Sequence, residues 1–252
     1  TSDFRDEKRL LEIVSEGQSQ MQSQMASRGD RTALNRALAY GSVSGAVRET
    51  LTGIPFFRLL TRIQSHFEEE KEALMQALEE LAAIIFRREN LLLDYVGTQE
   101  GWEKLEEETS RFAGKLYEGS ADTGSYRPVP QRKQEGFMTA GQVLYVCRAG
   151  NFKKKGLPYK GTLRFLQMMM RYDYLWVNIR VKGGAYGCSC SFGRSGESGF
   201  SSYRDPNLKN TVDIYEKAAE TVEKFTADER VMTQYIIGAV SEMDTPMNPA
   251  AY

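Results

Sequence analysis

The stretch Arg180-Val-Lys-Gly-Gly-Ala-Tyr-Gly187 is the least generic part of this 252-residue sequence. Its two adjacent glycines follow a helical pattern and precede a strand-like run. Because glycine has no side chain, they allow backbone conformations that other residues avoid, and they let another chain approach closely. Arg180 and Tyr186 flank the turn, and their guanidinium and phenol groups are suited to hold a peptide carbonyl or an oxyanion. The structural alternative is a helix C-cap followed by an ordinary hairpin, and the residues alone leave both interpretations open.

The residues around this turn predict a mixed layer of helices and strands. Apolar residues at helical spacing over 163–174 predict a helix before the turn. Two strands are expected near 185–192 and 200–204, joined by the glycine- and serine-rich turn 193–199. The run 143–147, Val-Leu-Tyr-Val-Cys, predicts a strand at the centre of the sheet.

Helices are predicted after these strands. Asp205-Pro206 has the form of an N-cap with a first-turn proline. Thr226-Ala-Asp-Glu229 has the form of a capping box, in which a hydroxyl and a carboxylate each satisfy a free backbone N–H. Met168-Met169-Met170 is expected to fill the core with adaptable side chains. Together the patterns predict an α+β fold, with helices against one face of a mainly antiparallel sheet.

The first 120 residues predict mainly helices. Ser65-His66-Phe67-Glu68 also has the capping-box form, which makes His66 an exposed residue just after an N-cap. The short apolar run 91–96, Leu-Leu-Leu-Asp-Tyr-Val, predicts a buried strand. Thr98 is then expected to cap the following helix.

One segment has the composition of a linker between domains. The stretch Gly119-Ser-Ala-Asp-Thr-Gly-Ser-Tyr126 is followed by Pro128 and Pro130, a composition typical of loops. We therefore expect a first domain over residues 1–125, a linker over 126–135 and a second domain over 136–252.

The composition limits the chemistry that the chain can perform. There is one histidine, His66, and there are three cysteines. A self-contained zinc hydrolase site normally needs two or three histidines, and a Ser-His-Asp or Cys-His arrangement could only be built around His66. The cysteines lack C-x-x-C spacing and are expected to be inert thiols in a reducing compartment. The sequence therefore predicts no metal ligand in this chain.

Charge and hydropathy bear on the partners. The 33 basic and 34 acidic residues nearly cancel, so the total gives no reason to expect a polyanion. Lys153-Lys154-Lys155 leaves nucleic-acid binding as a minor alternative, but stacking aromatics are not evident beside it. No apolar run approaches the length of about 18 residues that a membrane span needs, and the N-terminus is unlike a signal peptide. We expect no nucleic-acid or membrane partner, and residence in a bacterial cytoplasm, with an organellar matrix as the alternative.

A second motif, Ser202-Tyr-Arg-Asp-Pro-Asn207, follows the glycine turn. The two motifs together resemble the C-terminal half of presequence-protease-type peptidases, which belong to the insulinase/pitrilysin family of zinc metallopeptidases, the inverzincins. Residues 1–120 are similar to the third domain of that family and residues 136–252 to the fourth. The resemblance implies two-layer sandwich domains of the insulinase/mitochondrial-processing-peptidase type, the first incomplete at its N-terminus and the second at its C-terminus.

The resemblance also implies roles for single residues. In that family an N-terminal half binds zinc through H-x-x-E-H and a distal glutamate, and the C-terminal half closes over the substrate. By its matching position, Arg180 would bind a substrate backbone carbonyl, and Tyr186 would orient the substrate and steady the tetrahedral oxyanion. Gly183, Gly184 and Ala185 would form the wall that an extended peptide passes. H-x-x-E-H is absent here, so the resemblance implies zinc bound by the N-terminal half of the same polypeptide and none in this chain.

These implications give two functional hypotheses. The first is the C-terminal, substrate-binding half of a zinc metalloendopeptidase that degrades short unstructured peptides and is inactive without its other half. The second is a catalytically inactive relative that acts as a scaffold or partner subunit, and the presence of both Arg180 and Tyr186 argues against it. Tyr203, Arg204 and Asp205 match the family motif, but their chemistry predicts a strand end followed by a helix cap.

Overall fold

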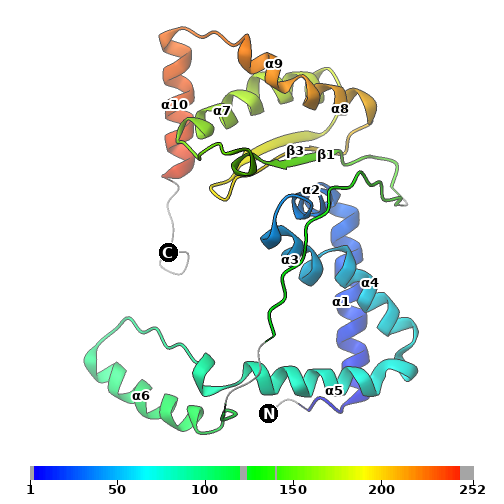
Figure 1. Cartoon of the computed structure of the whole chain (residues 1–252), viewed down its shortest axis with the longest axis vertical. Coiled ribbons are helices and arrows are strands. Elements are labelled where there is room, and N and C mark those ends of the chain that lie inside the picture. Colours follow the sequence, from blue (N-terminus) through cyan, green and yellow to red (C-terminus); the bar gives the residue numbers. More distant parts are fainter. Residues whose placement is uncertain (1–2, 120–123, 140, 245–252) are drawn as a thin grey trace. The chain divides into compact units, whose positions relative to one another are not determined.

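The computed structural model describes residues 3–119, 124–139 and 141–244 (Figure 1). The chain forms two compact units, each built from two separate segments. Unit 1 consists of Thr1–Ser19 and Leu59–Tyr126, and unit 2 consists of Gln20–Arg58 and Arg127–Tyr252.

Unit 2 contains a three-stranded antiparallel sheet in the order β1-β3-β2. The edge strands β1 (Cys147–Asn151) and β2 (Gly187–Phe192) both pair with the central strand β3 (Glu197–Tyr203). Gly187 lies opposite Tyr203, and Phe192 lies opposite Ser198. The predicted hairpin after the glycine turn is therefore confirmed.

The prediction of a central strand at 143–147 is wrong. Strand β1 starts only at the last of these residues, and it forms an edge of the sheet. Its partner β3 ends at Tyr203, because Arg204 takes a left-handed backbone conformation with a φ of 48°. Farther upstream an isolated bridge joins Leu144 to Asp205.

A long helix packs against this sheet. Helix α7 (Thr162–Met169) continues as the π-helix η3 (Met170–Val181), whose backbone hydrogen bonds span five residues. The residues that η3 buries lie on one side, with the adjacent pair Tyr174 and Leu175 four to five positions from the other two, and they make up much of the core: Met170, Tyr174, Leu175 and Ile179. Met169 and Met170 are each 1% exposed, so the prediction that the methionine run fills the core is confirmed.

Helices cover both faces of the sheet, as Figure 1 shows for α2 (Gly29–Ala39) and α7. Side chains alternate along β3: Phe200 stacks on Tyr215 of α8 (Lys209–Glu216), with ring centroids 5.3 Å apart. A Cβ atom at Gly199, on the other face, would lie 2.5 Å from Leu34 of α2. The prediction of helices on one face is therefore incomplete, because the missing side chain at Gly199 makes room for α2.

The helices that end unit 2 are α8, α9 (Ala218–Glu223) and α10 (Glu229–Met243). Two predicted caps are wrong. Asp205 does not cap α8, because its buried carboxylate accepts hydrogen bonds from Asn207 N at 2.8 Å and Thr211 Oγ1 at 2.7 Å. At α10 the cap is Asp228, which accepts from Val231 N at 2.8 Å, instead of Thr226.

An ion-pair cluster joins the segment around residue 135 to α2 and α3 (Val43–Thr52) within unit 2. Arg36 Nε and Nη2 donate to the two carboxylate oxygens of Glu135 at 2.9 and 3.1 Å, and the Tyr40 hydroxyl also donates to Glu135. The Arg36 guanidinium lowers the pKa of Glu135 to about 2. Glu49, 4% exposed, accepts from Ile54 N at 3.2 Å, and burial raises its pKa.

A short 3-10 turn, η2 (Phe152–Lys155), follows β1.

Unit 1 is helical. It contains most of α1 (Glu7–Ser27), most of α4 (Ile54–Ser65), α5 (Phe67–Ile85), the short η1 (Arg88–Asn90) and α6 (Gln99–Ala113). Its buried apolar residues come from α1, α4 and α5: Leu10, Val14, Leu60, Ile63, Phe67, Met75 and Ala82. Thr98 caps α6 by accepting from Gly101 N at 3.2 Å, which confirms that prediction.

Two other predictions for unit 1 are wrong. Ser65 is the last residue of α4 and caps nothing; His66 stands at the N-cap position of α5 and makes no side-chain cap. The run 91–96 is not a strand: Leu92 is 89% and Val96 96% exposed. A strand needs a partner for its backbone groups, and the named strands of the described residues all lie in unit 2.

Among the residues that the structure describes, none of the helices combines the length and the apolar character needed to cross a bilayer.

Candidate functional site

The glycine turn ends the π-helix η3. Gly184 N donates to Arg180 O at 3.0 Å, and Ala185 N donates to Ile179 O at 3.1 Å. Gly184 takes a left-handed φ of 79°, and a Cβ at Gly183 would lie 2.5 Å from Ile179 O. Both positions therefore need glycine to close the helix. Ala185 is 4% exposed, so of these three residues Gly184 offers the exposed backbone.

This closure brings Arg180 and Tyr186 together. Arg180 Nη1 donates to the backbone carbonyl of Tyr186 at 2.6 Å. The guanidinium carbon lies 5.5 Å from the centroid of the Tyr186 ring and 4.2 Å from that of Trp176, one turn earlier on η3. A guanidinium has five N–H donors, so this geometry leaves donors for a further acceptor.

Tyr186 is held by its backbone and open at its side chain. Its N–H donates to Tyr203 O at 3.0 Å, which ties the turn to the end of β3. Its ring packs edge-on against the Tyr203 ring, with centroids 5.9 Å apart. The side chain is nevertheless 65% exposed, so a phenol donor is presented from a fixed backbone.

The second motif braces the first. Asn207 Nδ2 donates to Gly183 O at 2.6 Å, and Asn207 N donates to Asp205 Oδ1 at 2.8 Å. Asp205 is 0% exposed and is fixed by Thr211 Oγ1. The sequence motif includes Asn207 but did not predict its contact with Gly183, although an aspartate that accepts from the backbone N–H two residues later is typical of turns.

Two further tyrosines anchor the same end of the sheet. The rings of Tyr145 and Tyr203 lie 5.6 Å apart. Their hydroxyls donate to the last carbonyls of α1, Tyr145 to Ala26 O at 2.9 Å and Tyr203 to Ser27 O at 3.2 Å. Carbonyls at a helix C-terminus lack partners within the helix. A Cβ at Gly29 would lie 2.3 Å from the Tyr145 ring, so these contacts fix β3 where it meets the turn.

The cysteines are poor nucleophiles in this setting. Burial raises the pKa of Cys188 to about 11 and that of Cys190 to about 12. A thiol reacts as its thiolate, so neither is prepared for catalysis near neutral pH. Among the described residues all three cysteines are free.

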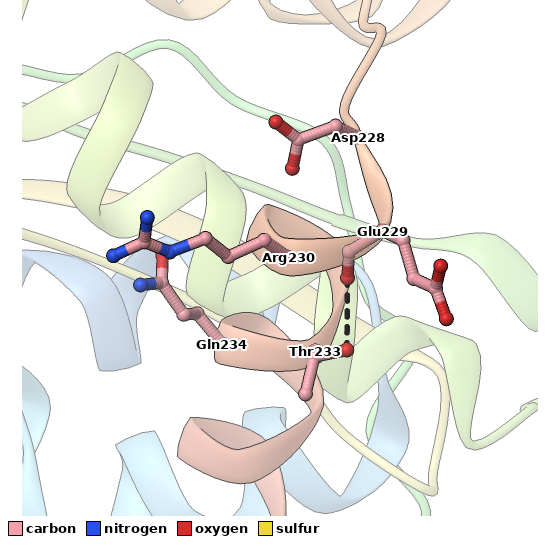
Figure 2. Close-up of a pocket in the computed structure, with 5 residues that line it drawn as sticks. All are labelled: Asp228, Glu229, Arg230, Thr233 and Gln234. Carbon is pink, nitrogen blue, oxygen red and sulfur yellow. Dashed lines mark hydrogen bonds between the residues drawn. The ribbon is translucent and has the colours of Figure 1, made fainter.

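The described residues do not suggest a separate catalytic centre. Within them no group of three or more His, Cys, Asp or Glu is placed to hold a metal ion. His66 is exposed, and its Nδ1 lies 3.2 Å from Arg62 O. Figure 2 shows a shallow hollow lined by Asp228 and the first turns of α10. Its side chains come from one helix and its cap, and its dashed bond, from Thr233 to Glu229 O, is an ordinary helix contact.

The chain is similar to known proteins over most of its length. Residues 134–252 match the family model of the PreP C-terminal domain, and residues 1–63 match that of a domain associated with M16 peptidases of subfamily C. Over 98% of its length the chain is 34% identical to Protein HypA of Clostridium perfringens, covering 25% of that protein. It is 28% identical to presequence protease 1, chloroplastic/mitochondrial, of Arabidopsis thaliana, again over 98% of the chain and 23% of the relative.

A mitochondrial presequence protease of Xenopus tropicalis is 22% identical over 98% of the chain and 27% of its own length. The chain thus spans about a quarter of the curated relatives that it matches. It is a relative of the presequence proteases of the M16 peptidase family, and it resembles their C-terminal part.

Proposed function

We propose that this chain is the C-terminal, substrate-binding half of a zinc-dependent metalloendopeptidase that degrades short unstructured peptides. The observation that carries the proposal is the pairing of Arg180 with Tyr186 across a glycine turn that fixes both residues. The relationship to presequence proteases supports the same interpretation. We further propose that residues 1–125 and 136–252, joined by a linker over 126–135, correspond to two domains of the insulinase/mitochondrial-processing-peptidase type, each a two-layer sandwich.

Arg180 would bind a backbone carbonyl of the peptide. One of its N–H groups is used by Tyr186 O at 2.6 Å, and the others can donate to a carbonyl oxygen in the same plane. Its charge also attracts the negative end of the carbonyl dipole. The residue thus orients the peptide before bond cleavage, which lowers the entropic part of the barrier.

Tyr186 would donate its phenol proton in a hydrogen bond to the oxyanion of the tetrahedral intermediate. Its backbone is held by Tyr203 O at 3.0 Å, while its ring is 65% exposed. A donor held in place before the reaction stabilises the developing charge without reorganising at that moment. The exposed backbone at Gly184, and the neighbouring Gly183 and Ala185, would form the wall beside an extended substrate.

The zinc belongs in this proposal to the N-terminal half of the same polypeptide, where it would activate the attacking water. The described residues of this chain offer no fitting ligand set for it. We propose that the 252-residue chain alone is inactive; peptide hydrolysis by it, abolished by a chelator, would contradict this.

The proposal is tested in the full-length peptidase. Arg180→Ala and Tyr186→Phe should each lower kcat/KM, on the order of 100-fold for the loss of one oxyanion donor, with zinc content unchanged. A matched control is Tyr172→Phe, which changes another exposed tyrosine, this one on η3. Wild-type kinetics in both site variants would refute the site assignment.

The second candidate is a catalytically inactive relative that serves as a scaffold or partner subunit. The presence of both Arg180 and Tyr186 argues against it, because an inactive scaffold does not need this pair of hydrogen-bond donors. Reading the polypeptide upstream for H-x-x-E-H separates the two candidates. We also propose residence in a bacterial cytoplasm, with an organellar matrix as the alternative, since relatives include a Clostridium protein and a chloroplastic/mitochondrial one; cell fractionation decides between them.

A further inference from the structure

The proposed function leaves the indole of Trp176 unexplained. Trp176 is one of two tryptophans in the chain and precedes Arg180 by four residues. The guanidinium carbon of Arg180 lies 4.2 Å from its ring centroid. The other arginine–ring pairs found among the described residues are 5.5 to 5.9 Å apart. A guanidinium so close over an indole makes a strong cation–π contact, and tryptophan is the best partner for it.

This contact engages a different part of Arg180 from its hydrogen bond. The guanidinium of Arg180 lies over the indole ring of Trp176. Its N–H groups, in contrast, point outward in the plane of the guanidinium. Nη1 is directed to Tyr186 O at 2.6 Å. The ring contact and this one hydrogen bond together restrict rotation of the Arg180 side chain. Its remaining N–H donors stay available for a ligand.

Core packing does not account for the indole. Trp176 is 39% exposed, whereas its neighbours Leu175 and Ile179 on η3 are 0% and 1% exposed. Removing a half-exposed ring opens no closed cavity, so the cost to the fold should be small. Its contact with the Arg180 guanidinium is therefore the specific interaction that the structure assigns to this ring.

We infer that Trp176 is a positioning residue of the proposed peptidase: its indole holds the Arg180 guanidinium in the orientation that binds the peptide carbonyl. The inference rests on the proposed function and extends it to a residue that does not itself touch the scissile bond.

The test compares replacements in the full-length peptidase that differ in their π-system. Trp176→Ala and Trp176→Leu should lower kcat/KM by roughly 2- to 30-fold, the range that a cation–π contact spans, whereas Trp176→Phe should stay within about 2-fold of wild type. Leucine keeps apolar cover on the helix, so it separates loss of the π-system from loss of packing. Tyr172→Ala is the matched control, because Tyr172 is 48% exposed on the same helix and pairs with Arg171 instead.

A double-mutant cycle then distinguishes positioning from a general structural effect. In an Arg180→Ala background, Trp176→Leu should cause no further loss of kcat/KM, because the residue that it positions is gone. Equal losses in the presence and absence of Arg180 would overturn the inference while leaving the proposed function intact. Unchanged kinetics for Arg180→Ala alone would overturn both.

The contact also has a readout that needs no activity. In a Trp102→Phe background Trp176 is the remaining tryptophan of this chain, and its fluorescence emission should shift when Arg180 is replaced by Ala. An identical emission spectrum with and without the guanidinium would show that the two groups are not in contact and would overturn the inference.

Discussion

The side-chain amide of Asn207 donates to the carbonyl of Gly183 at 2.6 Å. This bond joins the second sequence motif to the glycine turn that carries Tyr186. It also satisfies a carbonyl at the end of the π-helix, where helix carbonyls lack partners. The two sequence motifs therefore form one hydrogen-bonded substructure, in which the second motif supports the glycine turn of the first.

Replacing Asn207 should destabilise the glycine turn. Asn207→Ala removes the donor to Gly183 O, and we expect a loss of about 1–2 kcal/mol in the free energy of unfolding together with a lower kcat/KM in the full-length peptidase. Urea unfolding and steady-state kinetics measure the two effects. Asn210→Ala, at an exposed position of α8, is the control. Equal behaviour of the two variants would contradict the role given to Asn207.

The two glycines should differ in their tolerance of alanine. At Gly184 the nearest atom to an added Cβ is Pro206 Cγ at 3.7 Å, so Gly184→Ala should cost only the left-handed conformation, about 1–2 kcal/mol. At Gly183 the Cβ would lie 2.5 Å from Ile179 O, so Gly183→Ala should cost more. Unfolding free energies check the order, and Gly161→Ala, with open space around it, should be nearly neutral. The reverse order would contradict the described turn.

Glu135 should make stability depend on acid pH. Its folded pKa, about 2, lies below the ordinary 4.5 because of Arg36. Its contribution is therefore present above about pH 4.5 and is lost as the pH falls toward 2. Glu49, whose pKa is raised by burial, acts in the opposite sense. Comparing Glu135→Gln with wild type isolates the first effect: the difference in Tm should be larger at about pH 7 than near pH 2, and a difference independent of pH would disagree with the ion pair.

Thr211 should matter through one hydrogen bond. Its Oγ1 donates to Asp205 Oδ2 at 2.7 Å, and both residues are almost fully buried. Thr211→Val keeps the shape but leaves the carboxylate oxygen without this donor, which should cost about 1–3 kcal/mol. Thr233→Val removes an exposed hydroxyl bond of α10 and should change the unfolding free energy by less than about 0.5 kcal/mol. Similar losses at both positions would count against the buried bond.

The sequence predicted local patterns better than partners. The hairpin of β2 and β3, the buried methionines and the Thr98 cap follow from spacing and turn chemistry near each residue. The run 91–96 failed because its apolar character says nothing about whether another strand lies beside it.

Contacts between distant segments were beyond such patterns. The bond from Asn207 to Gly183 and the close approach of Gly199 to Leu34 each join residues far apart in the chain. The contact of Arg180 with Trp176, by contrast, is local: it joins residues four positions apart on one helix, a spacing at which side chains are neighbours.

The packing of α2 on the sheet has a consequence for how this protein can be divided. Leu34 lies in the stretch matched by the peptidase-associated model, residues 1–63, whereas Gly199 lies in the PreP C-terminal stretch, residues 134–252. The boundary of a family model is therefore not a folding boundary here. Expressed alone, residues 134–252 would leave one face of β3 open to water or to other chains. In evolution, recombination that exchanged one stretch without the other would have to rebuild this face, so the two stretches are expected to be inherited together.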